Sequence, residues 1–401
     1  MKPIHQNPHF TITHLTIEQP LIHKEPEGDT FEQHILILTP EKASNESPVF
    51  FILGGETTIS EKRLAKLYKN YGSPPEVIFI YAEHRGYGKS ISQQQDQSIP
   101  HYVNTRQALA DFHQAILHLK EKYTGIWMAA GYSYAGGLVI DFARRYSEDV
   151  KAILSSSGVV DWYFTMDAYD KGVRRIFGDA LYQRTEKHIH NLTPEKLFDR
   201  NWLEREFLIA IIHGISQYKK YKPLFHLFKY LTFFSTKTLL KTLHILDRLF
   251  ADNQAWKYAK ANAKLQLTRE EALTMDYQWR TWRFQQCNET GVFEVSAEGK
   301  GIFPRTQEDF IAECQALFGE EQPRALKKRW ALKSIINRLE VPLVYVAGEL
   351  DPWQALGARR NLRHKRYTYF FIPGAYHCPD SVNPKLGKRV LDVLLQYAKN
   401  R

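Results

Sequence analysis

The sequence predicts an α/β fold in which a mostly parallel sheet has helices on both faces. Over the first 160 residues, short apolar runs alternate with amphipathic helical patterns, which is typical of parallel strands joined by helices. From about residue 161 to residue 335 the patterns are mostly helical, and the strand pattern resumes at Pro342. A chain of 401 residues with 43% hydrophobic content can bury the large core that this fold requires.

The elements before residue 160 follow one another in a regular order. Strands are expected at Phe10–Ile17, Phe31–Leu38, 48–53, 76–83, Trp127–Tyr132 and Lys151–Gly158. The runs at 48–53 and 76–83 are mostly apolar, as expected for strands that are buried on both faces. Helices are expected at 61–72, 104–123 and from Ser133 to Tyr146, with apolar residues at helical spacing in the second.

The second half of the chain is expected to add a helical domain and to complete the sheet. Helices are predicted at Leu203–Tyr218, Leu224–Phe234, Thr236–Phe250 and Asn253–Ala263. Two strands, Leu343–Ala347 and 366–372, precede a final helix at about 384–399. We therefore expect residues 1–160 and 336–401 to form one discontinuous α/β domain, with residues 161–335 inserted as a helical domain.

Composition excludes some classes of function. The formal net charge is +10, but the basic residues are spread along the chain without a nucleic-acid-binding module, so we expect no nucleic-acid partner. No apolar run is long enough to span a bilayer, so stable membrane insertion is not expected. Residues 1–9 lack the apolar core of a secretory signal, which leaves a cytoplasmic location or export by another route.

The segment Phe225–Phe250 is basic and amphipathic, and it allows two interpretations. It can lie on a membrane surface, or it can form a helical pair that packs its apolar face on the rest of the protein. We favour packing, because most amphipathic helices in large chains have this arrangement.

The stretch Gly131-Tyr-Ser-Tyr-Ala-Gly136 has the pattern of a nucleophile elbow. In this motif a strand turns sharply into a helix, and the serine on the bend has a strained backbone that requires very small neighbours. Gly131, Ala135 and Gly136 meet that requirement around Ser133. The N-terminus of the following helix also directs N–H groups towards the place where an oxyanion forms.

A serine nucleophile needs a histidine base and a carboxylate that orients it. In an α/β-hydrolase these partners follow the serine in the order Asp, His, on loops after later strands. Asp351 and His377 lie just after the two strands expected in the second half of the chain, so we predict a Ser133–Asp351–His377 triad. Asp161 is an alternative source of the carboxylate, and Glu349 is a weaker one.

An oxyanion hole requires two N–H donors. Tyr134, which follows the nucleophile, is expected to provide one, and the loop at Gly55 and Glu56 the other, because its strand normally lies beside the elbow strand.

No cofactor and no metal are expected. Cys378 has no second ligand nearby in the sequence and is expected to be a small buried residue.

Five stretches along the chain carry a resemblance to a known family: Phe51–Glu56, Ala82–Ser90, Gly131–Gly137, Trp282–Gly291 and Gly348–Trp353. Together they resemble a group of serine peptidases that includes lysosomal Pro-Xaa carboxypeptidase, dipeptidyl peptidase II and bacterial tripeptidyl aminopeptidases. The stretch Trp282–Gly291 is the most specific of them, because α/β-hydrolases in general lack it.

The resemblance implies that Ser133, Asp351 and His377 are the charge-relay residues. It also implies that the inserted helices form a cap that admits only chain ends, so that the enzyme is an exopeptidase acting on short peptides. Members of the group are exported and disulfide-bonded, and Cys287 with Cys314 resembles one of their bridges.

Which end of a peptide is bound depends on charge. Glu56 and Glu289 are candidates to hold a free ammonium group, although either can instead accept hydrogen bonds that fix a loop. Arg85 is the candidate for a free carboxylate. Trp282 and Phe284, together with Trp353, are candidates for an apolar pocket, or they can simply pack in the core.

Three functions remain open from the sequence. The first is a serine exopeptidase that acts on small peptides, and within it we favour an aminopeptidase that releases di- or tripeptides. A homodimer is compatible with this function. The second is an esterase or lipase that uses the same triad on other acyl groups. The third is an inactive hydrolase fold that binds a partner.

Overall fold

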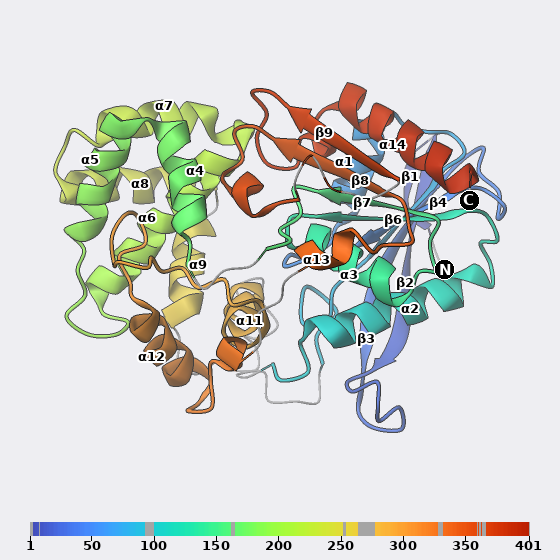
Figure 1. The fold of residues 1–401 in the computed structure, drawn as a ribbon, viewed down its shortest axis with the longest axis horizontal. Coiled ribbons are helices and arrows are strands. Elements are labelled where there is room, and N and C mark those ends of the chain that lie inside the picture. The colour runs from blue at the N-terminus through green and yellow to red at the C-terminus, as the bar shows by residue number, and fades with distance from the viewer. Residues whose placement is uncertain are drawn as a thin grey trace.

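Within the residues that the structure describes, nine strands form one sheet (Figure 1). The computed structural model describes residues 3–7, 9–92, 100–161, 165–251, 254–263, 277–327, 332–358, 360, 362 and 366–400. The strand order across the sheet is β1-β2-β3-β5-β4-β6-β7-β8-β9. Their bounds are β1 Pro3–Asn7, β2 Phe10–Pro20, β3 Thr30–Pro40, β4 Val49–Leu53, β5 Ile78–Ala82, β6 Trp127–Tyr132, β7 Ala152–Ser156, β8 Leu343–Gly348 and β9 Tyr367–Ile372.

The sheet combines an antiparallel side with a longer parallel one. Strands β1, β2, β3 and β5 pair antiparallel in that order, and β5, β4, β6, β7, β8 and β9 pair parallel. The elbow strand β6 therefore lies between β4 and β7, as the sequence predicts. Because the carboxyl ends of parallel strands meet at one edge, the loops after β4, β6, β7, β8 and β9 meet there.

Helices cover both faces of the sheet and build two cores. Helices α1 (Glu61–Asn70) and α14 (Pro384–Lys399) pack on one face. Helices α2 (Thr105–Lys120) and α3 (Tyr134–Arg145) pack on the other, where the short α13 (Lys333–Ile336) also lies. Asn104 begins α2 by accepting the N–H of Gln107, which satisfies a backbone donor at the helix start. This is the α/β-hydrolase fold.

The inserted helices lie together beside the carboxyl edge of the sheet, on the left of Figure 1. They are α4 Asp167–Phe177, α5 Asp179–His190, α6 Arg200–Gln217, the 3₁₀ turn Lys219–Tyr221, α7 Lys222–Leu231, α8 Thr236–Phe250, α9 Gln254–Ala263, α11 Tyr277–Gln285, the π-helix Gln286–Thr290 and α12 Gln307–Phe318. Short 3₁₀ turns at Arg324–Lys327, Pro352–Leu356 and Pro379–Ser381 complete the elements. A search of the described helices finds no segment able to cross a membrane.

Most of the predicted elements are confirmed, and the differences have local causes. Strand β1 was not predicted, because its polar sequence has no strand-like alternation, and it pairs only with β2. Strand β2 continues past Ile17 to Pro20 through pairing with β3. Helix α7 ends at Leu231, where a turn leads into α8. Asn253, expected to begin a helix, lies outside the described residues.

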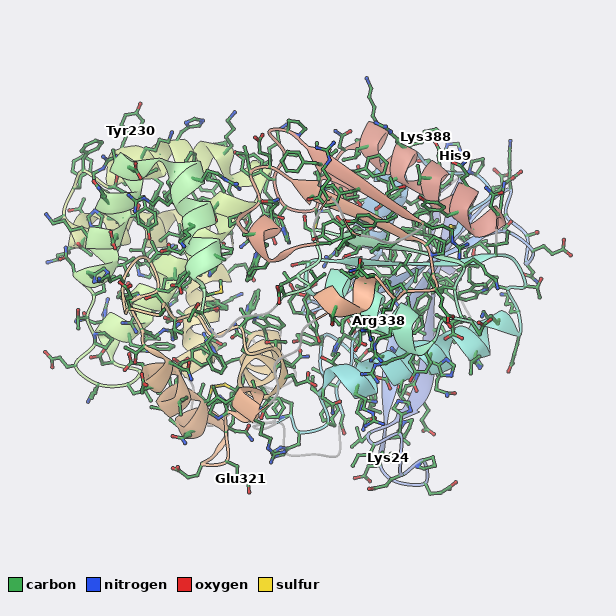
Figure 2. All side chains as sticks on the ribbon, in the orientation of Figure 1. His9, Lys24, Tyr230, Glu321, Arg338 and Lys388 are labelled. Atoms are coloured by element: carbon green, nitrogen blue, oxygen red, sulfur yellow. A yellow bond between two sulfur atoms is a disulfide. The ribbon has the colours of Figure 1, made fainter. Side chains whose placement is uncertain are left out.

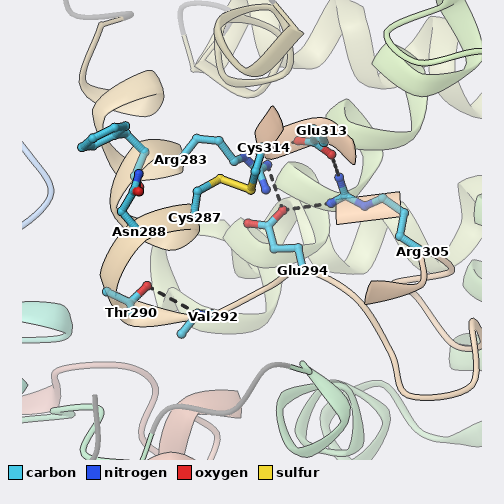
Figure 3. The surroundings of a disulfide bond; sticks show 10 residues. Arg283, Cys287, Asn288, Thr290, Val292, Glu294, Arg305, Glu313 and Cys314 are labelled. Carbon is cyan, nitrogen blue, oxygen red and sulfur yellow. Dashed lines mark hydrogen bonds and ion pairs between the residues drawn. A yellow bond between two sulfur atoms is a disulfide. The ribbon is translucent and has the colours of Figure 1, made fainter. Parts of the chain in front are cut away.

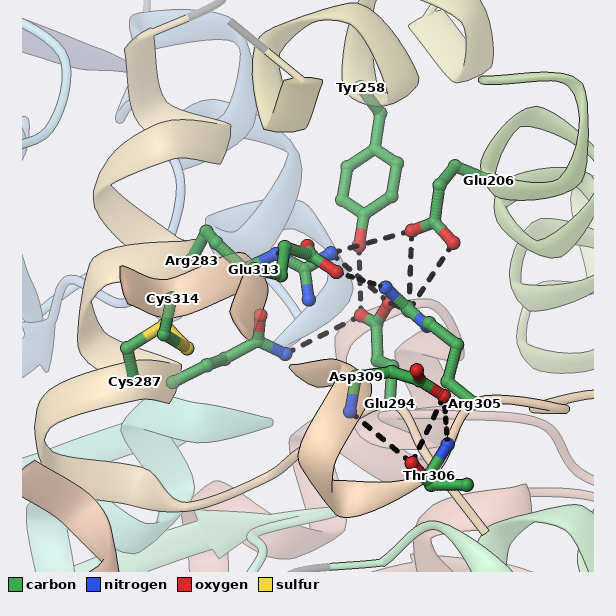
Figure 4. A network of polar contacts seen from close by, with 11 residues as sticks. Glu206, Tyr258, Arg283, Cys287, Glu294, Arg305, Thr306, Asp309, Glu313 and Cys314 are labelled. Atoms are coloured by element: carbon green, nitrogen blue, oxygen red, sulfur yellow. Dashed lines mark hydrogen bonds and ion pairs between the residues drawn. A yellow bond between two sulfur atoms is a disulfide. The ribbon is translucent and has the colours of Figure 1, made fainter. Parts of the chain in front are cut away.

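A buried ionic cluster holds the inserted helices together (Figure 4). Its members are Arg283, Arg305, Glu206, Glu294 and Glu313, each at most 5% exposed. The Nη1 of Arg305 donates to Glu313 at 2.6 Å, and its Nη2 lies 3.3 Å from Glu206. Such a cluster is costly to bury, but each carboxylate has a guanidinium partner that offsets its desolvation.

A disulfide between Cys287 and Cys314 joins the π-helix to α12 (Figure 3). Both cysteines are fully buried in a small apolar core with Phe284, Phe293 and Phe310. The third cysteine, Cys378, is free and buried. The disulfide and the ionic cluster lie side by side, so covalent and ionic links fix the same part of the insertion.

Candidate active site

Ser133 is the single residue between the end of strand β6 and the start of helix α3, and its backbone is strained. Its φ of 57° and ψ of −123° are unfavourable for a residue with a side chain. A Cβ at Gly131 would lie 1.9 Å from the carbonyl oxygen of Ala135, and one at Gly136 would lie 2.5 Å from the Cα of Gly158. These contacts explain why the elbow requires glycine on both sides of the serine.

Asp351 and His377 meet through a hydrogen bond. The Nδ1 of His377 lies 2.7 Å from the Oδ2 of Asp351, and both side chains are almost fully buried. Asp351 follows β8 and His377 follows β9, so the parallel pairing of these strands brings the two loops together. Among the described residues, the Nε2 of His377 has no hydrogen-bond partner, which leaves it open to a proton from a third group.

The elbow and the histidine loop share one anchor. The carbonyl oxygen of Ser156, at the end of β7, accepts the backbone N–H of Ser133 at 2.9 Å and the thiol of Cys378 at 3.6 Å. The backbone N–H of Cys378 also donates to the Oγ of Ser157 at 2.9 Å. The residue after His377 therefore lies against the same peptide as Ser133, which brings the two loops to one point of the sheet edge.

The pKa of His377 lies well above its usual value of 6.5. Burial alone would lower it, but the neighbouring Asp351 carboxylate and the Cys378 thiol raise it more. The imidazolium form of His377 is thus stabilised by its neighbours in the folded protein.

The loop after β4 lies directly on the start of α3. A Cβ at Gly55 would be 3.3 Å from the Cβ of Ala135 and 3.8 Å from the ring of Tyr134. The preceding N–H, that of Gly54, is already used by the carbonyl of Ala82 at 2.8 Å. The next N–H groups of this loop are those of Gly55 and Glu56, the two expected from the sequence.

Glu83 fixes this loop from behind. Its buried carboxylate accepts the N–H of Ile59 at 3.0 Å and the N–H groups of Lys89 and Ser90 at 2.8 and 3.1 Å. Burial raises the pKa of Glu83 to about 7, although these hydrogen bonds lower it in part. One carboxylate therefore ties the β4 loop to the loop after β5.

Glu56 is half-buried in this region, among charged and aromatic groups. Its enclosure raises the pKa of its carboxyl group, while its own N–H, Arg63 and His377 lower that pKa. The effect of His377 on this pKa links Glu56 electrostatically to the candidate site. Arg63 is exposed, and its Nη1 donates to the hydroxyl of Thr57 at 2.6 Å.

Glu289 and Arg85 are occupied elsewhere. The carboxylate of Glu289 accepts the N–H of Thr105 at 2.8 Å and its hydroxyl at 3.0 Å, at the N-terminus of α2. This geometry fits the interpretation in which Glu289 fixes a loop, and burial raises its pKa to about 7. The fully buried guanidinium of Arg85 binds Asp111 through two nitrogens and the carbonyl of Leu21, so it does not reach the triad.

The three aromatic candidates lie in different surroundings. The ring of Trp282 is 5.1 Å from that of Tyr134, beside the elbow. Trp353 follows Asp351, and the carboxylate of Asp351 accepts its backbone N–H at 3.0 Å. Phe284 instead packs against Phe318 at 5.2 Å, within the core around the disulfide. Only Trp282 and Trp353 adjoin residues of the candidate site.

The alternative carboxylates have other contacts. The Oε2 of Glu349 accepts the N–H of Gly374 at 2.7 Å and so ties the loop after β8 to the loop after β9. The backbone N–H of Asp161 donates to Leu356. The hydrogen bond to His377 is made by Asp351, as the sequence predicts.

Sequence reasoning missed two groups that support the histidine loop. Gln217, at the end of α6, accepts the backbone N–H of His377 at 3.1 Å, and the ring of Tyr218 lies 6.0 Å from the imidazole. Asp380 accepts hydrogen bonds from the hydroxyls of Tyr71 and Ser156 in the core. Gln217 belongs to no motif, whereas Asp380 lies three residues after His377 and could have been considered.

Comparisons with known proteins identify several serine peptidases that are similar to this chain. Over 401 aligned residues, the chain is 30% identical to lysosomal Pro-X carboxypeptidase of Mus musculus, covering 87% of this chain and 79% of that protein. It is 22% identical over 470 residues to thymus-specific serine protease of Mus musculus, covering 95% and 86%. It is 25% identical over 226 residues to prolyl tri/tetrapeptidyl aminopeptidase of Streptomyces mobaraensis, covering 55% and 42%.

The family described as serine carboxypeptidase S28 matches residues 23–191 and 235–388. These ranges include the elbow, the stretch Trp282–Gly291 and the loops after β8 and β9. The match covers well over half of the sequence, and the chain therefore belongs to the serine carboxypeptidase S28 family of serine peptidases.

Proposed function

We propose that this serine peptidase is an exopeptidase in which Ser133 is the nucleophile, His377 the general base and Asp351 the carboxylate that orients the base. The observation that carries the proposal is the 2.7 Å contact between His377 Nδ1 and Asp351 Oδ2, with Nε2 left without a partner among the described residues. The strained backbone of Ser133 on the elbow supports it, because strain at a bend exposes the hydroxyl.

In the proposed mechanism the Ser133 hydroxyl attacks the scissile carbonyl while His377 Nε2 takes its proton. The N–H groups of Tyr134 and Gly55 stabilise the oxyanion. We favour Gly55 over Glu56 because the N–H of Glu56 interacts with its own carboxylate. His377 then protonates the leaving amine, and water hydrolyses the acyl-enzyme by the same steps. Asp351 holds the imidazole in one tautomer throughout.

We further propose that residues 161–335 form a cap that limits the site to chain ends. Gln217 and Tyr218 of this region contact the His377 loop, and Trp282 contacts Tyr134, so the helices meet the site on two sides. A substrate chain that continued in both directions would have to pass these contacts.

We propose aminopeptidase action, with Glu56 as the group that holds the free ammonium. The loop that carries Glu56 lies on the start of α3, and His377 lowers the pKa of the Glu56 carboxyl group. Glu289, in contrast, is used at α2, and Arg85 is buried against Asp111. The similarity to a tri/tetrapeptidyl aminopeptidase is in line with this choice.

Carboxypeptidase action is the second candidate, because Arg63 is exposed and close enough to Glu56 to alter its pKa. An exposed guanidinium next to the site can bind a terminal carboxylate. The similarity to lysosomal Pro-X carboxypeptidase is in line with this alternative.

A fluorophosphonate probe tests the nucleophile first. Wild type is expected to take the label and Ser133→Ala to lose it with an unchanged melting temperature. A wild-type protein that stays unlabelled would overturn the triad assignment.

Peptides blocked at one end then separate the two exopeptidase candidates. If the enzyme cleaves peptides with a free N-terminus, and Glu56→Gln raises KM for them by about tenfold while Arg63→Gln does not, Glu56 is the ammonium site. The reverse pattern on peptides with a free C-terminus favours Arg63. Turnover of simple esters without cleavage of any unblocked peptide would contradict exopeptidase action.

A further inference from the structure

The segment 218–250, which contains helices α7 and α8, carries most of the exposed large apolar side chains among the described residues. Within the described ranges, eight of the fourteen exposed large hydrophobic residues lie between residues 218 and 250. They are Tyr218, Leu227, Tyr230, Phe233, Phe234, Ile245, Leu249 and Phe250. The other six are scattered and none is more than 57% exposed, whereas Tyr230 and Phe233 are each 70% exposed. Figure 2 shows Tyr230 at the outer edge of the inserted helices. Concentrated apolar exposure of this kind marks an interaction surface.

The exposed residues are additional to those that pack the two helices. Helix α7 is anchored by Phe228 and Leu231, and α8 by Leu239, Leu240 and Leu243, all of them buried. The packing interpretation favoured from the sequence therefore accounts for one face only. The opposite face of α7 and the turn after it leave their aromatic rings outside. We call the exposed residues of 218–250 the α7–α8 surface.

The charge of the α7–α8 surface is almost entirely positive. Seven basic residues lie in this segment: Lys219, Lys220, Lys222, Lys229, Lys237, Lys241 and Arg248. Its one acidic residue, Asp247, is buried, and its carboxylate accepts the N–H groups of Ala255 and Trp256. A second copy of this chain would bring like charges together, whereas an anionic surface is complementary.

Two aromatic rings of the segment lie against cations, that of Phe233 in the turn after α7 and that of Phe225 on α7. The guanidinium of Arg184 lies 4.0 Å from the ring of Phe233, and its Nε donates to the hydroxyl of Thr232 at 3.1 Å. The ammonium of Lys229 lies 4.7 Å from the ring of Phe225. Exposed aromatic rings with cations close by suit the interface of a membrane that carries anionic headgroups.

We propose that the α7–α8 surface binds membranes that carry anionic lipid headgroups, with Tyr230, Phe233 and Phe234 entering the headgroup layer. The basic residues of α7 and α8 contact the headgroups, and the apolar rings displace water from the interface. The segment begins at Tyr218, whose ring packs against His377, so binding would hold one side of the candidate site close to the membrane.

Vesicle co-sedimentation with the full chain tests the proposal. The protein is expected to sediment with vesicles of phosphatidylcholine mixed equally with phosphatidylglycerol, and much less with phosphatidylcholine alone. Rising salt should release it, because exposed charges are screened. Phe233→Ser combined with Phe234→Ser should lower the partition coefficient by about tenfold or more, and Lys237→Glu with Lys241→Glu by a similar factor.

Two matched double variants serve as controls. Leu117→Ser with Val382→Ser removes exposed apolar side chains elsewhere, and Lys66→Glu with Lys69→Glu reverses exposed charges on α1. Both should sediment as wild type does, and cleavage of a soluble peptide should be unchanged in all four variants.

Two results would overturn the proposal. One is sedimentation that does not differ between neutral and anionic vesicles at low salt, whether the protein binds both kinds of vesicle or neither. The other is a wild-type dimer in light scattering that Phe233→Ser with Phe234→Ser converts to a monomer, without any vesicle binding, which would assign the surface to a second copy.

Discussion

The backbone N–H of His377 donates to the carbonyl oxygen of Gln217 at 3.1 Å. Gln217 is the last residue of the 18-residue helix α6, so an inserted helix supports the loop that carries the candidate base. The side chain of Gln217 is fixed as well, since its Oε1 accepts the indole N–H of Trp353 at 3.0 Å and its Nε2 donates to Tyr169 at 3.0 Å. One residue thus links the inserted helices to the loops of both Asp351 and His377.

Gln217→Ala is expected to lower kcat by about tenfold with a small change in KM, because the carbonyl that holds His377 loses its side-chain anchors. Steady-state kinetics on a peptide substrate measures the effect, and Gln217→Glu, which keeps an acceptor for Trp353, should restore part of it. Tyr182→Phe removes a part-buried hydrogen bond to Asp170 that involves neither Gln217 nor His377, and it should leave kcat unchanged. If Gln217→Ala and Tyr182→Phe lowered kcat by the same factor, the role of Gln217 would be structural only.

The sheet could be predicted, and so could the places of the proposed triad residues at the ends of its strands, because both depend on local patterns. Uniformly apolar runs identify the parallel strands, and Ser133, Asp351 and His377 each follow one of them in a fixed order. The small residues of the elbow have a steric cause that is visible in the sequence, as Gly131 shows.

The surroundings of the triad could not be predicted, because they depend on contacts between distant segments. Gln217 reaches His377 across 160 positions of sequence, and nothing in the helical pattern of α6 distinguishes it. The carboxylates of Glu56 and Glu289 look alike in the sequence. Only the fold decides that the charge of His377 affects the carboxyl group of Glu56, whereas Glu289 binds the start of α2.

Activity is expected to rise with pH through an apparent pKa above 6.5. The base must be neutral to take the serine proton, and Asp351 and Cys378 stabilise its protonated form. Protonated His377 also contributes to the stability of the fold. This contribution is fully present below the pKa that His377 has in the unfolded chain, and it is lost as the pH rises through the higher pKa of His377 in the folded protein. In a profile of kcat/KM against pH, this rise forms an acid limb, and the midpoint of the limb gives the apparent pKa.

Asp351→Asn provides the control for this limb. It should lower kcat by about four orders of magnitude and move the limb to lower pH, because the imidazole loses its tautomer and its counter-charge. A limb at or below 6.5 in the wild type would contradict the raised pKa of His377.

Breaking the buried ionic cluster should destabilise the inserted helices. Arg305→Met leaves Glu313 and Glu206 without one of their guanidinium partners, which is expected to cost about 3–5 kcal/mol of unfolding free energy. Denaturant unfolding measures the loss. Arg324→Met, which removes the exposed pair with Glu321, is the control and should change stability by less than about 1 kcal/mol. Equal effects would mean that the cluster adds no more than a surface pair.

Gly131→Ala should damage both stability and activity, because its Cβ would overlap the Ala135 carbonyl oxygen at 1.9 Å and neither backbone can yield without moving Ser133. A loss of about 2–3 kcal/mol in unfolding free energy is expected, with a larger fall in kcat than stability alone explains. Gly214→Ala is the matched control within α6. Its Cβ would meet only the Tyr221 ring at 3.5 Å, so the helix should gain up to about 1 kcal/mol. If Gly131→Ala kept wild-type kcat, the steric account of the elbow would be wrong, since the serine would then tolerate a displaced turn.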